Sequence, residues 1–207
     1  MENNLVVQSN ELVLAAYTMT TKEKQLLLTC ISRIDSRPDA PNITKQTKFT
    51  VTVEEVAKIF YTDSTKKNAF RDLEQASNRL FDREVLIALE DNKTLRTRFV
   101  SGVLYDPNGE QITITFAEDV LPYLTQLKAN FTKYRLMEVS ELSSIHSMRL
   151  YELIVCWVGQ YQYTKSMDLD DFRYVMGIKG KYKQFGQLRE RVIETAIDEV
   201  NESTNYK

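Results

Sequence analysis

The sequence has few of the residues that metal, disulfide and membrane chemistry require. It contains one histidine and two cysteines, and no apolar run approaches the roughly 18–20 residues of a membrane-spanning helix. His146 alone cannot build a two-histidine metal site, and the cysteine and histidine count excludes a conventional zinc finger. Cys30 and Cys156 lie in apolar helical stretches, which predicts packing roles and no disulfide. We therefore expect neither a metal nor a cofactor.

Signals for catalysis and for export are also absent. No segment matches the phosphate-cradling pattern GxxxxGK[ST], and no pair of carboxylates stands out from ordinary surface charge. The N-terminus lacks a basic segment followed by an apolar one. These absences predict a protein of the cytosol that is not an enzyme and has no membrane partner.

The charge present is segregated along the chain. The 207 residues carry a net charge of −2, and their 43% hydrophobic content is typical of a folded protein with one large or two small domains. Between Arg173 and Arg191, however, six basic residues accompany one acid, Glu190. Because a binding footprint is a local field, this segment is a candidate for contact with nucleic acid.

One stretch of the first half, Thr62 to Asp82, has the pattern of a recognition helix. At 100° per residue, one arc of roughly 80° collects the polar residues Ser64, Lys67, Arg71, Gln75 and Asn78. The opposite side collects Ala69, Leu73, Ala76 and Leu80. A helix built in this way can rest in a DNA groove while its back packs on a core, although a solvated surface helix has the same pattern.

The neighbouring segments predict a winged helix. Thr20 with Glu23, and Thr52 with Glu55, have capping-box spacing and begin two helices. We expect strands at Phe49 to Val53, Arg83 to Glu90, Thr94 to Tyr105 and Glu110 to Phe116, and a strand or an irregular arm in residues 1–19. The expected hairpin around Asp91 carries Lys93, Arg96 and Arg98, where a wing would meet phosphates.

The second half of the sequence predicts a similar order of elements that ends in a second candidate reading helix. Residues 128–142 are expected to connect the halves, and Ser144 to Tyr161 to form a helix buried on much of its circumference. A short strand at Met167 to Leu169 and a helix from Asp170 to Met176 should follow. The second candidate reading helix runs from Tyr182 to about Glu202, with Phe185, Leu188, Val192 and Ala196 on its inner side and Lys183, Gln187, Glu190, Arg191 and Glu194 outward.

Several of these segments resemble one known family. They are VVQSNELVLAAYTMTTKEKQLLL, KKNAFRDLEQASNRLFDREV, ITITFAEDVLPYL, SSIHSMRLYELI and FGQLRERVIETAIDEVN. Over nearly the whole chain the sequence is similar to the replication initiators of iteron-containing bacterial plasmids (Rep3-type, RepB/RepE-like).

The resemblance implies an α+β fold of two tandem winged-helix domains. Domain 1 (1–130) would dimerise and contact DNA, and domain 2 (131–207) would be the main reader of the repeated origin sequence, the iteron. Monomers of such families bind direct repeats and help to open the origin with a host initiator and helicase. Their dimers bind an operator inverted repeat and repress the initiator's own gene. The sequence ends at Lys207, after the second reading helix, so the C-terminal wing strands are expected to be missing.

Together these patterns predict a set of DNA-binding residues. The set is Lys66, Lys67, Asn68, Arg71, Gln75, Asn78, Lys93, Arg96, Arg98, Lys179, Lys181, Lys183, Gln184, Gln187 and Arg191. Arg189 lies at the core boundary, where it could pair with an acid. Two alternatives remain open: a tandem winged-helix repressor with no replication role, and a protein-interaction module that binds no DNA.

Overall fold

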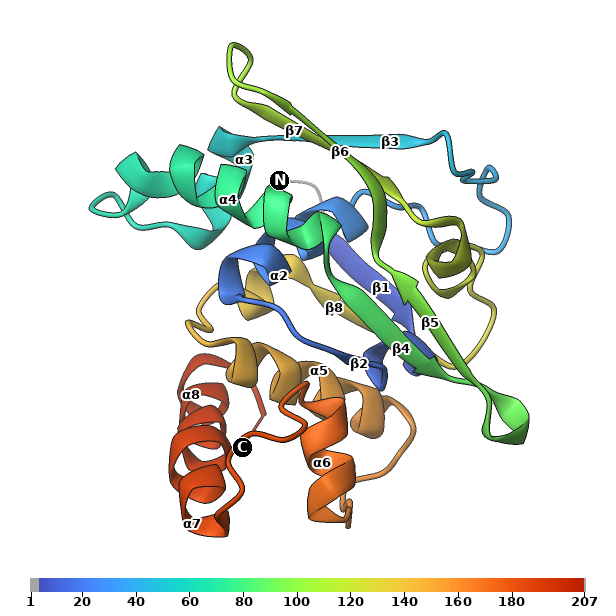
Figure 1. The fold of residues 1–207 in the computed structure, drawn as a ribbon, viewed down its shortest axis with the longest axis vertical. Coiled ribbons are helices and arrows are strands. Elements are labelled where there is room, and N and C mark those ends of the chain that lie inside the picture. The colour runs from blue at the N-terminus through green and yellow to red at the C-terminus, as the bar shows by residue number, and fades with distance from the viewer. Residues whose placement is uncertain (1–3, 207) are drawn as a thin grey trace.

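The computed structural model describes residues 4–206 and confirms the α+β prediction with two winged-helix units. We call residues 4–142 the first unit and residues 143–206 the second unit. Three small sheets and several helices build the first unit, and helices alone build the second within the described residues (Figure 1). Helix α5 (Ile145–Gly159) crosses the molecule between the two units.

The helices of the first unit begin where their capping residues predict. Thr20 caps α2 (Thr21–Ile31) and Thr52 caps α3 (Val53–Phe60), each through a complete capping box. The predicted reading helix is shorter than expected: a 3₁₀ turn at Lys66–Asn68 leads into α4 (Ala69–Phe81). Helix α4 packs on α2 and on strand β6 (Val100–Asp106).

A three-stranded sheet in the order β3–β7–β6 completes the winged helix of this unit. It contains β3 (Lys48–Thr52), β7 (Gln111–Phe116) and β6 (Val100–Asp106). Phe49 of β3 and Val103 of β6 both pair with Ile114 of the central strand. The hairpin β6–β7 therefore occupies the position of the wing.

The prediction of one strand from Thr94 to Tyr105 is wrong. Strand β5 (Thr94–Arg98) pairs with β4 (Glu84–Ala88), which pairs in turn with β2 (Ala16–Tyr17). The break falls where Phe99 and Val100 are buried consecutively, because two adjacent inward side chains interrupt the alternation of a single strand. The β4–β5 hairpin, with a 3₁₀ turn at Glu90–Asn92, thus belongs to a separate sheet.

The segment 128–142, expected to be a connection, contains a strand. Strand β8 (Phe131–Arg135) pairs antiparallel with β1 (Leu5–Ser9), with Val6 opposite Tyr134. A 3₁₀ turn at Leu136–Val139 follows, another lies at Glu118–Tyr123, and the short helix α1 (Asn10–Val13) follows β1. A boundary after residue 130 therefore separates β8 from its pairing partner.

The second unit consists of helices α5, α6 (Leu169–Val175), α7 (Phe185–Leu188) and α8 (Thr195–Ser203). A π-helical segment, Arg189–Glu194, joins α7 to α8, so the second reading helix begins at Phe185 rather than Tyr182. The predicted strand at Met167 to Leu169 is wrong, because α6 already begins at Leu169. From residue 136 to residue 206 the described chain forms no strand, so this unit has no wing within that range.

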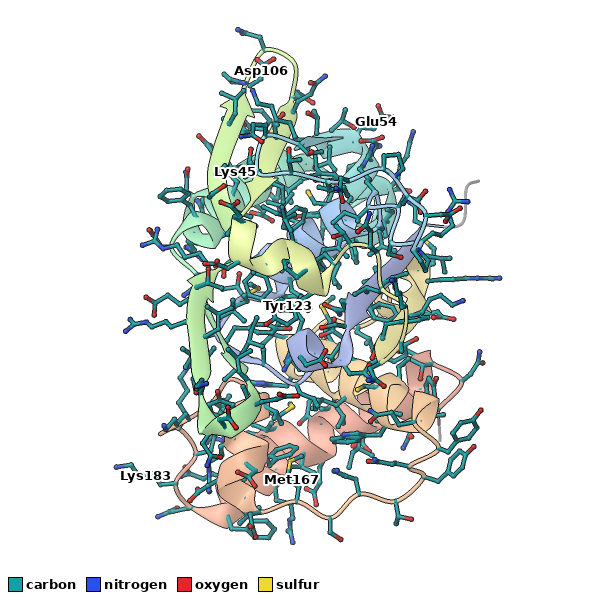
Figure 2. All side chains as sticks on the ribbon, turned by 90° about the vertical axis from the view of Figure 1, so that its right-hand side faces the viewer. Lys45, Glu54, Asp106, Tyr123, Met167 and Lys183 are labelled. Atoms are coloured by element: carbon teal, nitrogen blue, oxygen red, sulfur yellow. The ribbon has the colours of Figure 1, made fainter. Side chains whose placement is uncertain are left out.

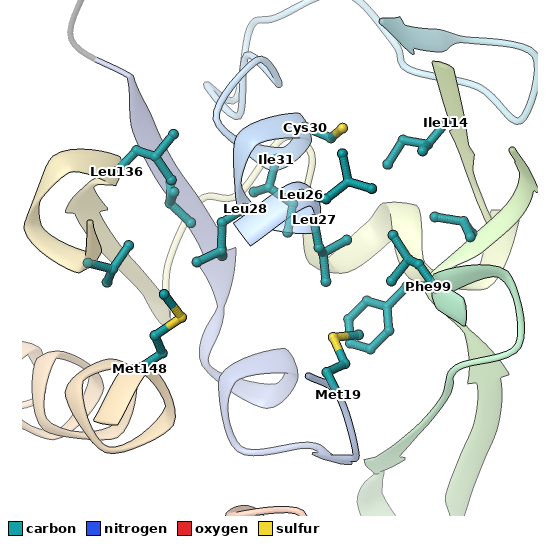
Figure 3. Packing of buried hydrophobic residues seen from close by; sticks show 14 of the residues in the cluster. Met19, Leu26, Leu27, Leu28, Cys30, Ile31, Phe99, Ile114, Leu136 and Met148 are labelled. Carbon is teal, nitrogen blue, oxygen red and sulfur yellow. The ribbon is translucent and has the colours of Figure 1, made fainter. Parts of the chain in front are cut away.

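Two hydrophobic cores support the two units. The larger surrounds α2, whose Leu26, Leu27 and Leu28 are almost completely buried (Figure 3). The smaller includes Leu188, Val192 and Ala196 of the second reading helix. Helix α5 contributes to both cores, as its broad apolar surface predicted.

Candidate nucleic-acid interface

Helix α4 has the two-sided character that its sequence predicts. Leu73, Ala76 and Leu80 are at most 2% exposed and anchor its back in the larger core. The opposite side exposes Arg71, Gln75 and Asn78, and the preceding turn exposes Lys66 and Lys67. Asn68, also in the predicted set, is only half-buried.

The cations at the start of this helix are largely uncompensated. Among residues 4–206, no acidic group forms an ion pair with Lys66 or Lys67. Arg71 contacts its neighbour Asp72 at 3.4 Å, a long and exposed pair that solvent screens. Two lysines without partners at the N-terminal end of a helix form a local positive field that favours an anion such as phosphate.

The three cations on the β4–β5 hairpin, in contrast, all have acidic neighbours. Arg96 makes a bidentate pair with Glu84 at 2.8 Å, and Lys93 contacts Asp91 at 3.3 Å. Arg98 donates to the Phe81 carbonyl and lies 3.9 Å from Asp82. The hairpin therefore has little net positive charge to offer.

The hairpin in the wing position carries no basic side chain at its tip. The turn between β6 and β7 consists of Asp106, Pro107, Asn108, Gly109 and Glu110. The side chain of Asp106 accepts bonds from the backbone N–H groups of Asn108 and Gly109, which closes the turn. The expectation that the wing itself supplies Lys93, Arg96 and Arg98 is wrong, because these residues belong to the other hairpin.

The second reading segment offers a denser set of free groups. Lys179, Lys181 and Lys183 precede α7, and all three are exposed. Figure 2 shows Lys183 projecting from the loop at the edge of the second unit. The same face exposes Gln184, Gln187 and Arg191, and within the described chain none of the six basic or amide groups of this segment enters an ion pair.

Arg173, which contributes to the basic count of this segment, has a structural role. Its side chain is 13% exposed and pairs with Asp170 at 2.9 Å. It also donates to the carbonyl oxygens of Tyr182 and Lys183, which fixes the loop before α7.

The reading helix itself departs from regular α geometry. The Thr195 hydroxyl donates to the Glu190 carbonyl, five residues earlier, at 2.9 Å, and Arg189 pairs with Glu194, five residues later, at 3.1 Å. Both spacings fit a π turn, which brings residues i and i+5 together. The pairing of Arg189 with an acid is confirmed, whereas Phe185, predicted to face inward, is 52% exposed because it stands in the first turn, outside the core.

His146 lies beneath this basic loop, on α5. Its ring centroid is 6.2 Å from that of Tyr182, and burial, together with the charge of Lys181, lowers the pKa of the imidazole. This environment favours the neutral imidazole, and His146 packs against Tyr182 as a structural group. Within the described residues no three His, Cys, Asp or Glu side chains are grouped as metal ligands would be.

A groove of about 360 Å³ lies between the two units. Lys179 and Lys181 line it from the second unit. Asp82, Arg83 and Glu84, which follow α4, line it from the first unit. The segment after α4 and the loop before α7 thus line the same groove.

Sequence patterns did not single out one group of polar residues, a buried ionic cluster beneath this groove. Lys24, Arg149 and Glu152 are at most 1% exposed, and Glu152 accepts from Lys24 at 2.9 Å. The available signal was the charged residues Lys24, Arg149 and Glu152, which stand beside apolar residues in the sequences of α2 and α5.

Comparison with known proteins places this geometry in a family. The family "Initiator Replication protein, WH1" matches residues 5–155, and "Initiator Rep protein, WH2" matches residues 168–207. An Escherichia coli "Replication initiation protein" is 27% identical over the whole chain, which spans 65% of that relative's length. An "Uncharacterized 27.6 kDa protein" of Escherichia coli is 22% identical over 96% of the chain and 85% of its own length.

A solved structure has the same fold. The Pi initiator protein, crystallised in complex with iteron DNA, superimposes with a TM-score of 0.77 at 18% identity, covering 98% of this chain and 88% of that one. No helix among residues 4–206 is long and apolar enough to cross a membrane. With both of its winged-helix units matched, the chain belongs to the family of replication initiator proteins.

Proposed function

We propose that this protein binds double-stranded DNA sequence-specifically, with both units on one duplex. The observation that supports this best is the two-sided character of both helices. Helix α4 is buried in the larger core and α7–α8 is buried in the smaller core through Leu188, Val192 and Ala196, while the cationic and amide side chains of both are exposed. Cations without acidic partners attract the phosphate backbone, and amide or guanidinium groups on a reading helix can bond to base edges.

The biological role that we infer is initiation of plasmid replication in bacteria. The protein would bind the directly repeated iterons of an origin, help to open it together with a host initiator and helicase, and repress its own gene as a dimer on an inverted repeat. Family membership and the iteron DNA in the similar Pi structure support this proposal. Direct repeats of roughly two helical turns beside an A·T-rich segment, near the gene, would favour it over a repressor without a replication role.

We further propose a division of labour between the units. The first unit would dimerise and support DNA binding, because β5 is an outer strand of the β2–β4–β5 sheet and an open edge can pair with another chain. The second unit would read the iteron bases through Gln187 and Arg191. Lys66, Lys67, Lys179, Lys181 and Lys183 would contact phosphates.

The test compares substitutions in a duplex-binding titration. The probe is the sequence that the wild-type protein selects from a random duplex pool, beside a scrambled duplex. Arg191→Ala and Gln187→Ala should relax the preference at a particular base pair by about 1–3 kcal/mol. Lys67→Ala should weaken both duplexes to a similar extent, as loss of a phosphate contact would.

Arg96→Ala is the matched control. Its guanidinium is already paired with Glu84, so we expect a smaller loss for either duplex than Lys67→Ala produces. If all four variants bind like the wild-type protein, or if no duplex sequence is enriched, the proposed function is wrong.

A further inference from the structure

The buried side chain of Arg149 joins the two units. It projects from α5 and is 1% exposed. Its Nη2 donates to two main-chain carbonyls: that of Ala15, 3.1 Å away in the first unit, and that of Val175, at the end of α6 in the second. One guanidinium thus bonds the main chains of both units.

The carbonyl of Val175 needs such a donor. Helix α6 ends in a Schellman motif, in which Ile178 N–H donates to the Arg173 carbonyl and Gly177 N–H to the Tyr174 carbonyl. These bonds leave the Val175 carbonyl among the unsatisfied groups at the negative end of the helix dipole. Arg149 supplies both the missing hydrogen bond and a positive charge.

The backbone at the end of α6 packs so closely on the first unit that a larger residue would not fit. Gly177 adopts φ +67°, and a Cβ placed on it would lie 1.8 Å from the Tyr17 carbonyl oxygen. The Thr18 hydroxyl donates to the Gly177 carbonyl at 3.1 Å. The end of α6 is therefore seated directly on the segment that contains β2.

The remaining guanidinium contacts hold Arg149 in place through Tyr17 of the first unit and Glu152 on α5 itself. Its Nη1 donates to the Tyr17 hydroxyl at 2.6 Å and to Glu152 at 3.3 Å, and its Cζ lies 4.3 Å from the centre of the Tyr17 ring. Glu152 also accepts from Lys24, Gln8 and Tyr134. An arginine fixed on so many sides has no alternative rotamer that keeps its bonds, so it defines one position for the α6 terminus.

We propose that Arg149 is a positioning residue that sets the orientation of the second unit against the first. The basic loop from Lys179 to Lys183 starts two residues after Gly177, and α7–α8 follows it. Fixing the end of α6 therefore fixes the second reading helix relative to α4. That this fixed separation matches the spacing of DNA half-sites depends on the proposed function, whereas the fixed orientation does not.

The experiment measures this orientation in the full chain without DNA. Spin labels are attached to Arg79→Cys on α4 and Asp198→Cys on α8, two exposed positions outside the predicted DNA-binding set. The native thiols are buried, and burial raises the pKa of Cys30 to about 12, so labelling favours the introduced cysteines. Double electron–electron resonance then gives the distribution of the α4–α8 distance.

The parent protein should give one narrow peak, and Arg149→Met and Arg149→Lys should both lose it. Lysine keeps the charge beside Glu152 but cannot bond both carbonyls and the Tyr17 hydroxyl. Gly177→Ala adds a methyl group that would clash with the Tyr17 carbonyl, so it should displace the end of α6 and shift the peak. Leu28→Ala, a cavity variant in the first core, should be less stable yet keep the parent peak.

A broad distribution in the parent protein, or a narrow and unshifted peak in both Arg149→Lys and Gly177→Ala, would overturn the proposal. So would equal broadening in Leu28→Ala, since general loosening would then explain the effect. If Arg149→Met does not fold, Arg149→Lys and Gly177→Ala still test the proposal. Because no DNA is present, these outcomes are independent of whether the protein binds iterons.

Discussion

At the scale of single residues, the Glu152 carboxylate is held on several sides. It is fully buried between Lys24 and Arg149 and accepts bonds from Gln8 and Tyr134. Burial alone would raise its pKa, but the charges of Lys24 and Arg149 more than offset this, so the pKa of Glu152 lies below its usual value. Two buried cations depend on this one anion.

Replacing Glu152 with glutamine should therefore be costly. The change leaves two buried cations without a counter-charge, for which a loss of about 3–5 kcal/mol is expected in urea unfolding at pH 7. Gln25→Ala, beside the cluster in sequence but outside its hydrogen bonds, is the control and should lose less. Equal stability of Glu152→Gln and the wild-type protein would contradict the assigned role.

The same carboxylate should make the fold sensitive to acid. Because its pKa is lowered in the folded state, its stabilisation is complete at a pH above the usual pKa of an unfolded glutamate and is lost as the pH falls through the lower pKa of the folded state. The urea midpoints of the wild-type protein and Glu152→Gln should differ at neutral pH and converge as the pH is lowered into the acidic range. A gap that stays constant would refute this.

At the scale of elements, the π segment explains the spacing of the second reading helix. Its buried residues Leu188, Val192, Ala196 and Val200 are separated by four positions each, a spacing that drifts by roughly 40° per step on a regular α-helix. A wider turn within the helix offsets the drift. It also keeps Gln187 and Arg191, likewise four apart, in one outward row.

Deleting Glu190 should convert the segment to a regular α-helix. The spacing after Leu188 then becomes three, four and four, which is an ordinary helical stripe, so thermal stability should stay within a few degrees of the wild type. Arg191 would turn by about 100° relative to Gln187, and the selected duplex should lose its advantage over a scrambled one. Circular dichroism melting and duplex titration measure the two effects. Unfolding, or unchanged sequence preference, would count against this account of the π turn.

Sequence reasoning succeeded where the determinants are local. The capping residues Thr20 and Thr52, and the apolar stripe of α4, each act within a few positions and predicted their helices. Strand β8 was missed because its partner, β1, lies more than a hundred residues away, and FTKYR is too short to show a pattern of its own. The split between β5 and β6 and the role of Arg149 likewise depend on distant packing at Phe99 and Val175.

At the scale of the whole molecule, the ion pairs divide the candidate cations into two classes. Arg71, Lys93, Arg96 and Arg98 have acidic neighbours. Within the described residues, six form no ion pair: Lys66, Lys67, Lys179, Lys181, Lys183 and Arg191. A net charge of −2 therefore conceals two locally positive segments, one in each half of the chain.

This division predicts how binding depends on salt. Each phosphate neutralised contributes about −0.9 to the slope of log K against log salt, so six free cations allow a slope of up to about −5. Alanine at any of the six should make the slope less negative by about 0.9, and alanine at Arg96 by less. Titration of a random-sequence duplex at several salt concentrations measures this. A flat slope would instead favour a protein partner.

Helix α5 belongs to both hydrophobic cores, and this limits how the molecule can be divided. A cut in the exposed loop between Gln160 and Asp168 would leave the later helices without Leu150, Leu153 and Cys156 to pack against. Recombination between related initiators could therefore exchange DNA specificity only if the breakpoint lay ahead of α5. Even then, Arg149 from the exchanged C-terminal part would have to fit the Ala15 carbonyl and the Tyr17 side chain of the retained N-terminal part.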